Sequence, residues 1–245
     1  MSDFRIFNMQ QFEKYINSLC VLRMIKRIQL HHTYSPSYKQ FTGDNHTALQ
    51  SAMRSYHIKT NGWSDIAQHF TIFPDGIIVT GRSIEMVPAG IKGANTGAIA
   101  IECLGNFDEG ADTMTSEQRE AIIRVVKCLA KRFGLDAKSA VTYHSWWTSG
   151  GKELCDYVAS KSCKTCPGTD FFGGNTREAF ENNLLPLISE EKEPLKSIDK
   201  INDIIWELMN KGIVTDGKLW MEKCQSDKNV YCLCKKMANY IRGTL

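Results

Sequence analysis

The segment Lys164-Thr165-Cys166-Pro167-Gly168 places a reactive thiol in a backbone of restricted shape. The Pro-Gly pair after Cys166 is typical of a turn, so the sulfur has a defined direction. A cation such as Lys164, two residues earlier, lowers the pKa of a nearby thiol and favours the thiolate. Thiolate binds Zn²⁺ strongly, and a catalytic zinc has three protein ligands and one open position. Taken alone, the segment is more often a buried, unreactive thiol in a turn.

Two histidines could complete such a zinc site. His31 ends the run Ile28–His31, and His144 ends the run Ala140–His144. Both runs are typical of short strands, and binding residues of open α/β sheets lie where strands meet loops. Two histidines and a cysteine hold a zinc that polarises carbonyls and lowers the pKa of bound water to about 7. The sequence therefore predicts one Zn²⁺ per chain, bound by His31, His144 and Cys166.

Glu102 is the single charged residue in the apolar run Ala98–Leu104, which is typical of a central strand buried on both faces. A carboxylate in such a strand is costly unless it is paired or used. Desolvation raises the pKa of a buried carboxyl, so Glu102 could take a proton from water beside the metal. Lys164 could stabilise a developing oxyanion. Together these residues predict the hydrolysis of an amide or an ester.

The apolar spacing predicts the elements that position these residues. A hairpin is indicated by two short apolar runs, 69–73 and 77–80, around Pro74-Asp75-Gly76. Helices are expected over residues 9–20, 46–60, 115–133 and 176–188. The second of these should bury Leu49, Met53 and Tyr56. The third carries a capping box of Thr115 with Gln118 and a C-terminal Gly134. The loop of about 20 residues between His144 and Cys166 is long enough to be functional.

Two domains are expected. Glu190 to Pro194 is charged and ends in proline, which is typical of a linker. Residues 1–190 would form the catalytic domain, and residues 195–245 a small module of two or three helices without catalytic residues. A unit of that size buries little core by itself.

Composition excludes several classes of protein. The 245 residues are 42% hydrophobic and 23% charged, as in soluble globular proteins. A net charge of +3 is too small to indicate nucleic-acid binding, and no apolar run approaches the roughly 18 residues of a membrane span. The first residues lack a signal-peptide pattern, which predicts synthesis in the cytoplasm. Nine cysteines, an odd number without scaffold spacing, favour reduced thiols.

Several blocks in one order make residues 20–188 resemble the type 2 N-acetylmuramoyl-L-alanine amidases, a family related to peptidoglycan-recognition proteins and phage amidases. The blocks are Leu30-His31-His32-Thr33, Gly62-Trp63-Ser64-Asp65-Ile66-Ala67-Gln68-His69-Phe70 with Pro74-Asp75-Gly76, Asn95-Thr96-Gly97-Ala98-Ile99-Ala100-Ile101-Glu102, His144, and Lys164-Thr165-Cys166-Pro167-Gly168. The resemblance implies a central mixed β-sheet flanked by helices and a zinc held by two histidines and a cysteine. It also implies cleavage between N-acetylmuramic acid and L-alanine of peptidoglycan.

Matching position by position, the resemblance assigns the metal ligands to His31, His144 and Cys166, with His31 preferred over its neighbour His32. Lys164 matches the lysine that stabilises the oxyanion, and Glu102 the acid/base glutamate. One position departs from the pattern, because Gln68 stands where many relatives have a catalytic tyrosine. Glutamine cannot shuttle a proton, so the base is expected to be Glu102, with Gln68 at most a hydrogen-bond donor.

The predicted function is that of a phage or prophage endolysin, which is made in the cytoplasm, acts on the bacterial cell wall after release and has peptidoglycan as its partner. The C-terminal module could bind the wall or a second chain, and the oligomeric state is left open. A non-catalytic peptidoglycan-binding protein is the alternative, although Cys166, Lys164 and Glu102 argue against it.

Some residues have more than one interpretation. A structural zinc site could use His144 and three cysteines, but this leaves His31 and Glu102 unexplained. The other histidines are expected to be structural or exposed. Two adjacent aromatic residues could line a sugar-binding groove. The cysteines concerned are Cys155, Cys163 and Cys166, the histidines are His32, His46, His57 and His69, and the aromatic pair is Trp146 and Trp147.

Overall fold

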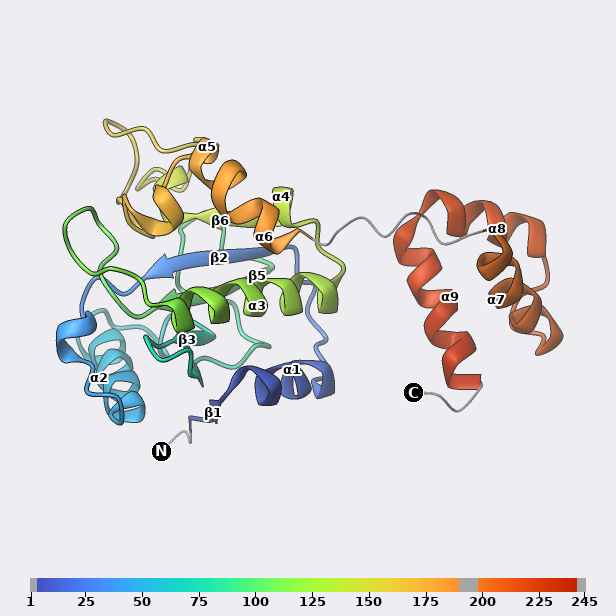
Figure 1. Cartoon of the computed structure of the whole chain (residues 1–245), viewed down its shortest axis with the longest axis horizontal. Helices are drawn as coiled ribbons and strands as arrows, with labels where there is room; N and C mark the ends of the chain where they lie inside the picture. Colours follow the sequence, from blue (N-terminus) through green and yellow to red (C-terminus); the bar gives the residue numbers. More distant parts are fainter. Residues whose placement is uncertain (1–3, 190–197, 242–245) are drawn as a thin grey trace. The chain divides into compact units, whose positions relative to one another are not determined.

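A computed structural model of the chain describes residues 4–189 and 198–241. Its contacts divide the chain into two compact units, Met1–Ser189 and Glu190–Leu245 (Figure 1). The expected linker from Glu190 to Pro194 lies outside the described residues. Each unit is described by itself below.

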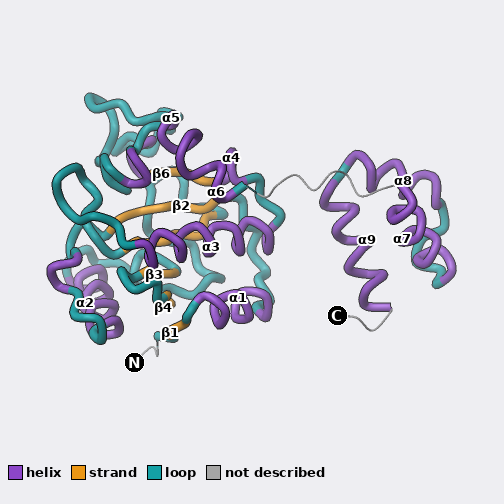
Figure 2. Tube along the Cα trace, viewed as in Figure 1, coloured by secondary structure: helices purple, strands orange, loops and turns teal. Residues whose placement is uncertain are grey.

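The first unit contains one sheet of six strands (Figure 2). The strands are β1 Ile6–Phe7, β2 Arg27–His32, β3 Phe70–Ile72, β4 Ile78–Thr80, β5 Ala98–Cys103 and β6 Val141–Tyr143. Their spatial order is β1-β4-β3-β5-β2-β6. The four strands β3, β5, β2 and β6 run parallel to one another, whereas β4 is antiparallel to both of its neighbours, β3 and β1. The expected mixed sheet is therefore confirmed, including the hairpin of β3 and β4 and the central position of β5.

The two faces of the sheet differ in chemistry because side chains alternate along each strand. Ile28 and Leu30 of β2 join the main apolar core, which also includes Ile101 of β5 and Ile122 of the helix that covers this face. On β2, Gln29 and His31 alternate with those apolar residues. Glu102 is the register partner of His31, so these two side chains share the polar face. The polar residues of the parallel strands thus meet near one edge of the sheet.

Three longer helices flank the sheet (Figure 1): α1 Met9–Ser18, α2 His46–Lys59 and α3 Ser116–Phe133. The C-terminal end of α3 is as expected, since Gly134 adopts the left-handed conformation at φ 64°, and at the N-terminal end Thr115 Oγ1 accepts from Gln118 N. The reciprocal half of the capping box is absent. The Gln118 amide instead donates to the carbonyls of Ile72 and Leu104, so it ties the helix to the sheet.

The buried face of α2 differs from the one expected. Met53 is buried, but Tyr56 is 58% exposed, and the other buried residues of this helix are His46 and Gln50. The reason is a polar contact, because the Gln50 amide accepts from Thr71 Oγ1 at 2.7 Å and donates to the Thr80 carbonyl at 3.0 Å. Apolar spacing cannot reveal a helix face that packs through hydrogen bonds.

The expected helix over 176–188 is broken. It begins as α5 Arg177–Ala179, passes through a π-helical turn over Phe180–Leu184 and ends as α6 Leu185–Ile188, while α4 Ala137–Ala140 precedes β6. Pro186 lies in the first turn of α6. Proline has no N–H and its ring clashes with the carbonyl four residues earlier, so a regular helix cannot continue through it.

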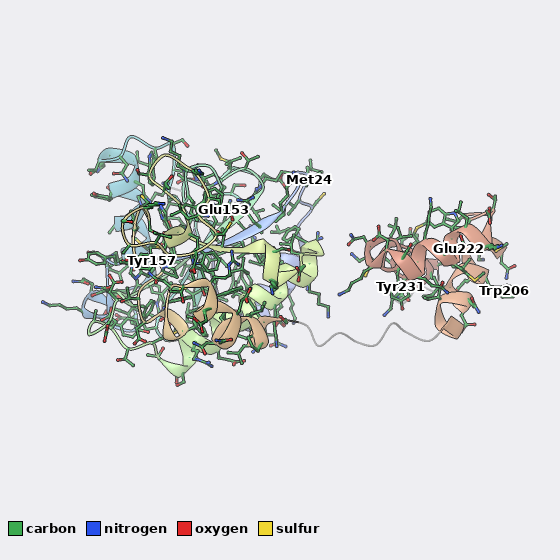
Figure 3. The ribbon with its side chains drawn as sticks, turned by 90° about the horizontal axis from the view of Figure 1, so that it is seen from above. Met24, Glu153, Tyr157, Trp206, Glu222 and Tyr231 are labelled. Atoms are coloured by element: carbon green, nitrogen blue, oxygen red, sulfur yellow. The ribbon has the colours of Figure 1, made fainter. Side chains whose placement is uncertain are left out.

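The second unit consists of α7 Ile198–Asn210, α8 Gly217–Ser226 and α9 Lys228–Ile241. Its small core is made by one face of each helix and includes Ile205, Leu208, Cys224 and Cys234. Trp206, labelled in Figure 3, lies at the surface with 69% of its area exposed. Among the residues that the structure describes, no helix of either unit is long and apolar enough to span a membrane.

Candidate metal centre

His31 and His144 meet because their strands are parallel neighbours. β2 pairs with β6 through Leu30 and Tyr143, so both strands end at the same edge of the sheet. His31 is the penultimate residue of β2, and His144 begins a short 3₁₀ turn directly after β6. The two imidazole centroids lie 5.3 Å apart with their planes nearly perpendicular. The topology thus brings together two rings that are far apart in the sequence.

Cys166 joins them from the loop that follows. Its carbonyl accepts from the backbone N–H of Ser145 at 2.7 Å, which places the thiol beside the turn of His144. Cys166 Sγ lies 3.4 Å from Nδ1 of His31. One nitrogen from each histidine and this sulfur all lie within 4.8 Å of one another. The structure therefore brings the three predicted ligands into one group.

The loop that carries Cys166 is anchored on both sides. Asp108 accepts from the Thr165 hydroxyl at 3.2 Å and from the Thr169 N–H at 3.1 Å, and Asn175 donates to the Thr165 carbonyl at 2.7 Å. Earlier in the loop, Trp147 and Glu153 form a β-bridge (Figure 3 labels Glu153). The sequence analysis missed Asp108, whose only signal is its place in a polar segment after β5. The anchoring defines the direction of the sulfur.

Gly168 shows why this turn needs glycine. Its φ is +124°, a backbone conformation that residues with a side chain rarely adopt. A Cβ added at this position would lie 2.3 Å from the Phe107 carbonyl oxygen. The peptide from Cys166 to Pro167 is cis. The backbone of the turn therefore passes directly against the segment after β5, two residues beyond the thiol.

The protonation states of the group suit a metal. Burial is the main cause that lowers the pKa of His31 well below 6.5, and His144 and Lys164 add to the shift. Burial, with Lys164, lowers the pKa of His144 to about 4. Both rings are thus neutral at pH 7 and offer lone pairs. Burial raises the pKa of the Cys166 thiol, Glu102 raises it further and Lys164 opposes this.

Two neutral imidazoles and a thiol form a donor set that fits zinc better than calcium or magnesium, which prefer oxygen. A bound zinc would be held by His31, His144 and Cys166, and it would displace the thiol proton. With three ligands from the protein, such a site keeps a position open for water or substrate, as catalytic zinc sites do. The group therefore passes a chemical test for the predicted cofactor.

Glu102 lies next to this group without belonging to it. It is the register partner of His31, and its charge raises the pKa of the Cys166 thiol. The residue as a whole is partly exposed, but its Oε2 atom is buried without a hydrogen-bond partner among the described residues. Burial raises the pKa of Glu102 to about 8, and Lys164 opposes the shift. This carboxyl can therefore hold or release a proton near neutral pH.

Lys164 is exposed on the anchored loop. Its charge lowers the pKa of both histidines of the group and of Glu102, so the ammonium lies within electrostatic reach of all three. The ammonium group of Lys164 is therefore a cation that could interact with an anion developing at the site.

Gln68 is buried in a hydrogen-bond chain. Its Nε2 donates to Thr71 Oγ1 at 2.9 Å, and Thr71 donates in turn to Gln50 at 2.7 Å. The Oε1 atom of Gln68 is buried and lacks a hydrogen-bond partner among the described residues. Gln68 was expected to be at most a hydrogen-bond donor, and its side-chain N–H group donates to Thr71.

The alternative zinc site with three cysteines is not formed. Cys155 and Cys163 are exposed, and in residues 4–189 and 198–241 the group of His31, His144 and Cys166 is the one cluster able to hold a metal. All nine cysteines are free thiols, as expected.

The expectation that Trp146 and Trp147 line a groove is wrong. Trp146 is completely buried and Trp147 is 5% exposed. Their indole N–H groups donate to the Asn175 carbonyl at 2.7 Å and to Thr142 Oγ1 at 2.9 Å. Both indoles belong to the main apolar core of the first unit.

The other histidines have structural partners, in agreement with their interpretation. The ring nitrogens of His32, His57 and His69 accept from backbone N–H groups of Phe107, Ala67 and Ala100, and His46 pairs with Asp75 at 2.8 Å. Burial is the main cause that lowers the pKa of His32 to about 4 and that of His69 to about 3. These four rings therefore make hydrogen bonds or an ion pair within the fold.

Comparison with known proteins gives a family match over residues 22–169, to the family described as N-acetylmuramoyl-L-alanine amidase. The chain is 30% identical over 100 residues to the N-acetylmuramoyl-L-alanine amidase of Homo sapiens, covering 41% of this chain and 16% of that protein. It is 34% identical over 89 residues to peptidoglycan-recognition protein SC2 of Drosophila melanogaster, covering 36% and 46%. The chain thus spans less than half the length of either relative.

Among solved structures, wild-type Drosophila PGRP-LB resembles this chain with a TM-score of 0.50 at 17% identity, covering 71% of this chain and 88% of that one. At this identity the likeness concerns the fold alone. It agrees with the mixed six-stranded sheet and its flanking helices.

Proposed function

This chain belongs to the N-acetylmuramoyl-L-alanine amidase family, and we propose that it is a zinc-dependent enzyme that hydrolyses the amide bond between N-acetylmuramic acid and L-alanine in peptidoglycan. The observation that carries the proposal is the group of His31, His144 and Cys166, whose ligand atoms lie within 4.8 Å of one another. All three residues fall inside the family match over residues 22–169.

Each residue of the site has a part in this reaction. A zinc ion held by the group supplies a Lewis acid and lowers the pKa of water. Glu102 accepts a proton from the attacking water and delivers it to the leaving amide nitrogen. Lys164 stabilises the negative charge that develops on the carbonyl oxygen. The anchored loop keeps Cys166 and Lys164 in position relative to the sheet.

The proposal is tested with purified peptidoglycan. We expect the chain to release new L-alanine amino termini, and a chelator to stop the release. New ends of another kind would mean that a different bond is cut. Binding to the polymer without any new ends, with zinc present, would identify a peptidoglycan-binding protein, the kind of activity that the name of the recognition-protein relative indicates.

Replacing Lys164 by alanine tests the oxyanion role. We expect kcat to fall by about 10²–10³, the cost of one lost oxyanion-stabilising donor, with a much smaller change in KM. Lys161→Ala is the matched control, because Lys161 is also exposed on the same loop but is not among the charges that shift the pKa values of His31, His144 and Glu102. A defect of Lys164→Ala confined to KM would instead assign the lysine to substrate binding.

The second unit is proposed to assist on the intact wall, as in a phage or prophage endolysin that reaches the wall after release. Residues 1–190 contain the whole candidate site and a core of their own, so we expect this fragment to fold alone. It should keep zinc and cleave soluble muropeptides at the rate of the full chain, but act more slowly on intact walls. Equal rates of fragment and full chain on intact walls would contradict the targeting role.

A further inference from the structure

The geometry points to Gln29 as a positioning residue: its side-chain oxygen holds Nε2 of His31 in the protonated form and so presents the Nδ1 lone pair to the metal. This inference rests on the proposed function, because it concerns the zinc site. It adds a residue that neither the family match nor the sequence resemblance assigns.

The two ring nitrogens of His31 face different partners. Nδ1 lies 3.4 Å from Cys166 Sγ, within the candidate ligand group. Nε2 lies 3.4 Å from Oε1 of Gln29. Gln29 is completely buried, two residues before His31 on β2, so both side chains project from the same face of the strand. Gln29 therefore contacts the ring nitrogen of His31 that is not near the thiol.

The orientation of the Gln29 amide follows from its other contacts. Its Nε2 donates to the Ala94 carbonyl at 3.0 Å and lies 3.4 Å from Oδ1 of Asn95. A flipped amide would place its oxygen against those two oxygens, so the network requires the NH₂ group to face them. Oε1 then faces His31 as an acceptor. An acceptor there needs a hydrogen on Nε2 of the ring, which leaves the lone pair on Nδ1.

The loop over 89–97 is built around this amide. Oδ1 of Asn95 accepts from the backbone N–H groups of Gly90 and Ile91 at 3.0 and 2.8 Å, which folds the loop back over β2. A Cβ at Gly90 would lie 2.3 Å from Oε1 of Gln29 and 3.0 Å from Nε2 of His31. Any side chain at position 90 would therefore clash with the Gln29–His31 contact.

A partner behind a metal-binding histidine sets the ring orientation and the tautomer, and its loss costs about 10- to 100-fold in metal affinity or activity. The acceptor here is a neutral amide, so it performs this task without adding a charge to the site. Its signal in the sequence was the alternation of Ile28-Gln29-Leu30-His31, which puts a buried polar residue on the face of the ligand.

The experiment measures the zinc dissociation constant of the full chain by competition with a chromophoric chelator. Gln29→Met keeps the size of the side chain and removes the acceptor, and we expect it to raise the dissociation constant by about 10- to 100-fold. Gln29→Glu keeps an acceptor facing His31 but sets a carboxylate oxygen against the oxygens of Ala94 and Asn95, so it should bind zinc more tightly than Gln29→Met although it lowers the melting temperature. Gln118→Met is the matched control: Gln118 is also completely buried and donates to two carbonyls, but it lies on α3. The Gln118→Met substitution should lower the melting temperature without raising the zinc dissociation constant.

A second readout does not depend on any variant. Long-range ¹⁵N–¹H couplings of the zinc-bound wild type should show His31 protonated at Nε2. A His31 protonated at Nδ1, or a Gln29→Met protein that binds zinc as tightly as the wild type, would overturn the inference and leave the proposed function standing. A wild-type chain that binds no zinc would overturn both.

Discussion

Cys166→Ser is expected to lose zinc and nearly all hydrolysis while the first unit stays folded. A serine hydroxyl is not deprotonated near neutral pH, so the site would keep two imidazoles and lose its one anionic ligand. Since the loss of a partner behind a ligand already costs about 10- to 100-fold, the loss of a ligand should cost more than about 10²-fold in activity. The fold should persist, because the main core lies between the sheet and α3 and its buried members do not include Cys166.

Three measurements check this expectation: zinc per chain by elemental analysis, release of L-alanine ends, and the circular dichroism melting curve. The wild type should hold about one zinc per chain. Cys163→Ser is the matched control, because Cys163 is exposed on the same loop, three residues from Cys166, and is not in the ligand group. It should keep zinc and activity. A Cys166→Ser protein with full metal content and full turnover would refute the assignment of this ligand.

Glu102→Gln is expected to lower kcat by about 10²–10⁴ with zinc still bound, the contribution typical of general acid–base catalysis. Glutamine keeps the shape of the side chain but cannot accept a proton. Gln68→Ala should cost far less, because the Gln68 amide is committed to Thr71 and offers no titratable proton. Near wild-type turnover of Glu102→Gln would place the catalytic base elsewhere.

The pH dependence of the rate gives an independent check on Glu102. A base must be ionised, so the wild-type rate should rise with pH as this carboxyl loses its proton. Burial raises its pKa to about 8 without a metal, and a bound cation would lower it. The acid limb of the pH–rate profile should therefore be absent in Glu102→Gln. An unchanged acid limb would show that another group titrates there.

In metal-free protein, the pH dependence of the free energy of unfolding should also reveal the protonation of Glu102. Its pKa is about 8 in the folded chain against an ordinary value of 4.5, so the folded state binds the proton more tightly. The free energy of unfolding should then fall as pH rises from about 4.5 to about 8. Glu102→Gln should lack this part of the decrease. Because His31 and His144 titrate in both proteins, the difference between the two melting profiles isolates Glu102.

Several local features could be predicted from the sequence because short-range chemistry determines them. Pro74-Asp75-Gly76 predicts the turn of the hairpin, and Thr115 and Gly134 mark the ends of α3, since each acts on backbone groups only a few residues away. The apolar run Ala98–Leu104 predicts a central strand because burial on both faces leaves no place for polar side chains. The mixed sheet with flanking helices was expected from the family resemblance, and the structure has it.

Tertiary contacts decided the features that the sequence analysis missed. The exposed Tyr56 and the buried pair Trp146 and Trp147 depend on which neighbour fills the adjacent space. Hydrogen bonds across elements also redirected two glutamines: Gln118 reaches the sheet instead of its own helix end, and Gln68 reaches Thr71. None of these contacts has a periodic signature along the chain.

For the candidate site, the sequence by itself determined which side chains could do the chemistry, because His31, His144 and Cys166 are the residue types that zinc selects and each ends a strand or occupies a turn. Only the tertiary structure decided that they meet: His31 and Cys166 are 135 positions apart, and parallel pairing of β2 with β6 and the anchored loop close that distance to 3.4 Å. It also decided which nitrogen of His31 faces the thiol. That choice depends on Gln29 and the loop folded over it, because a tautomer is set by the partners that surround a ring and not by the neighbours of the residue in the chain.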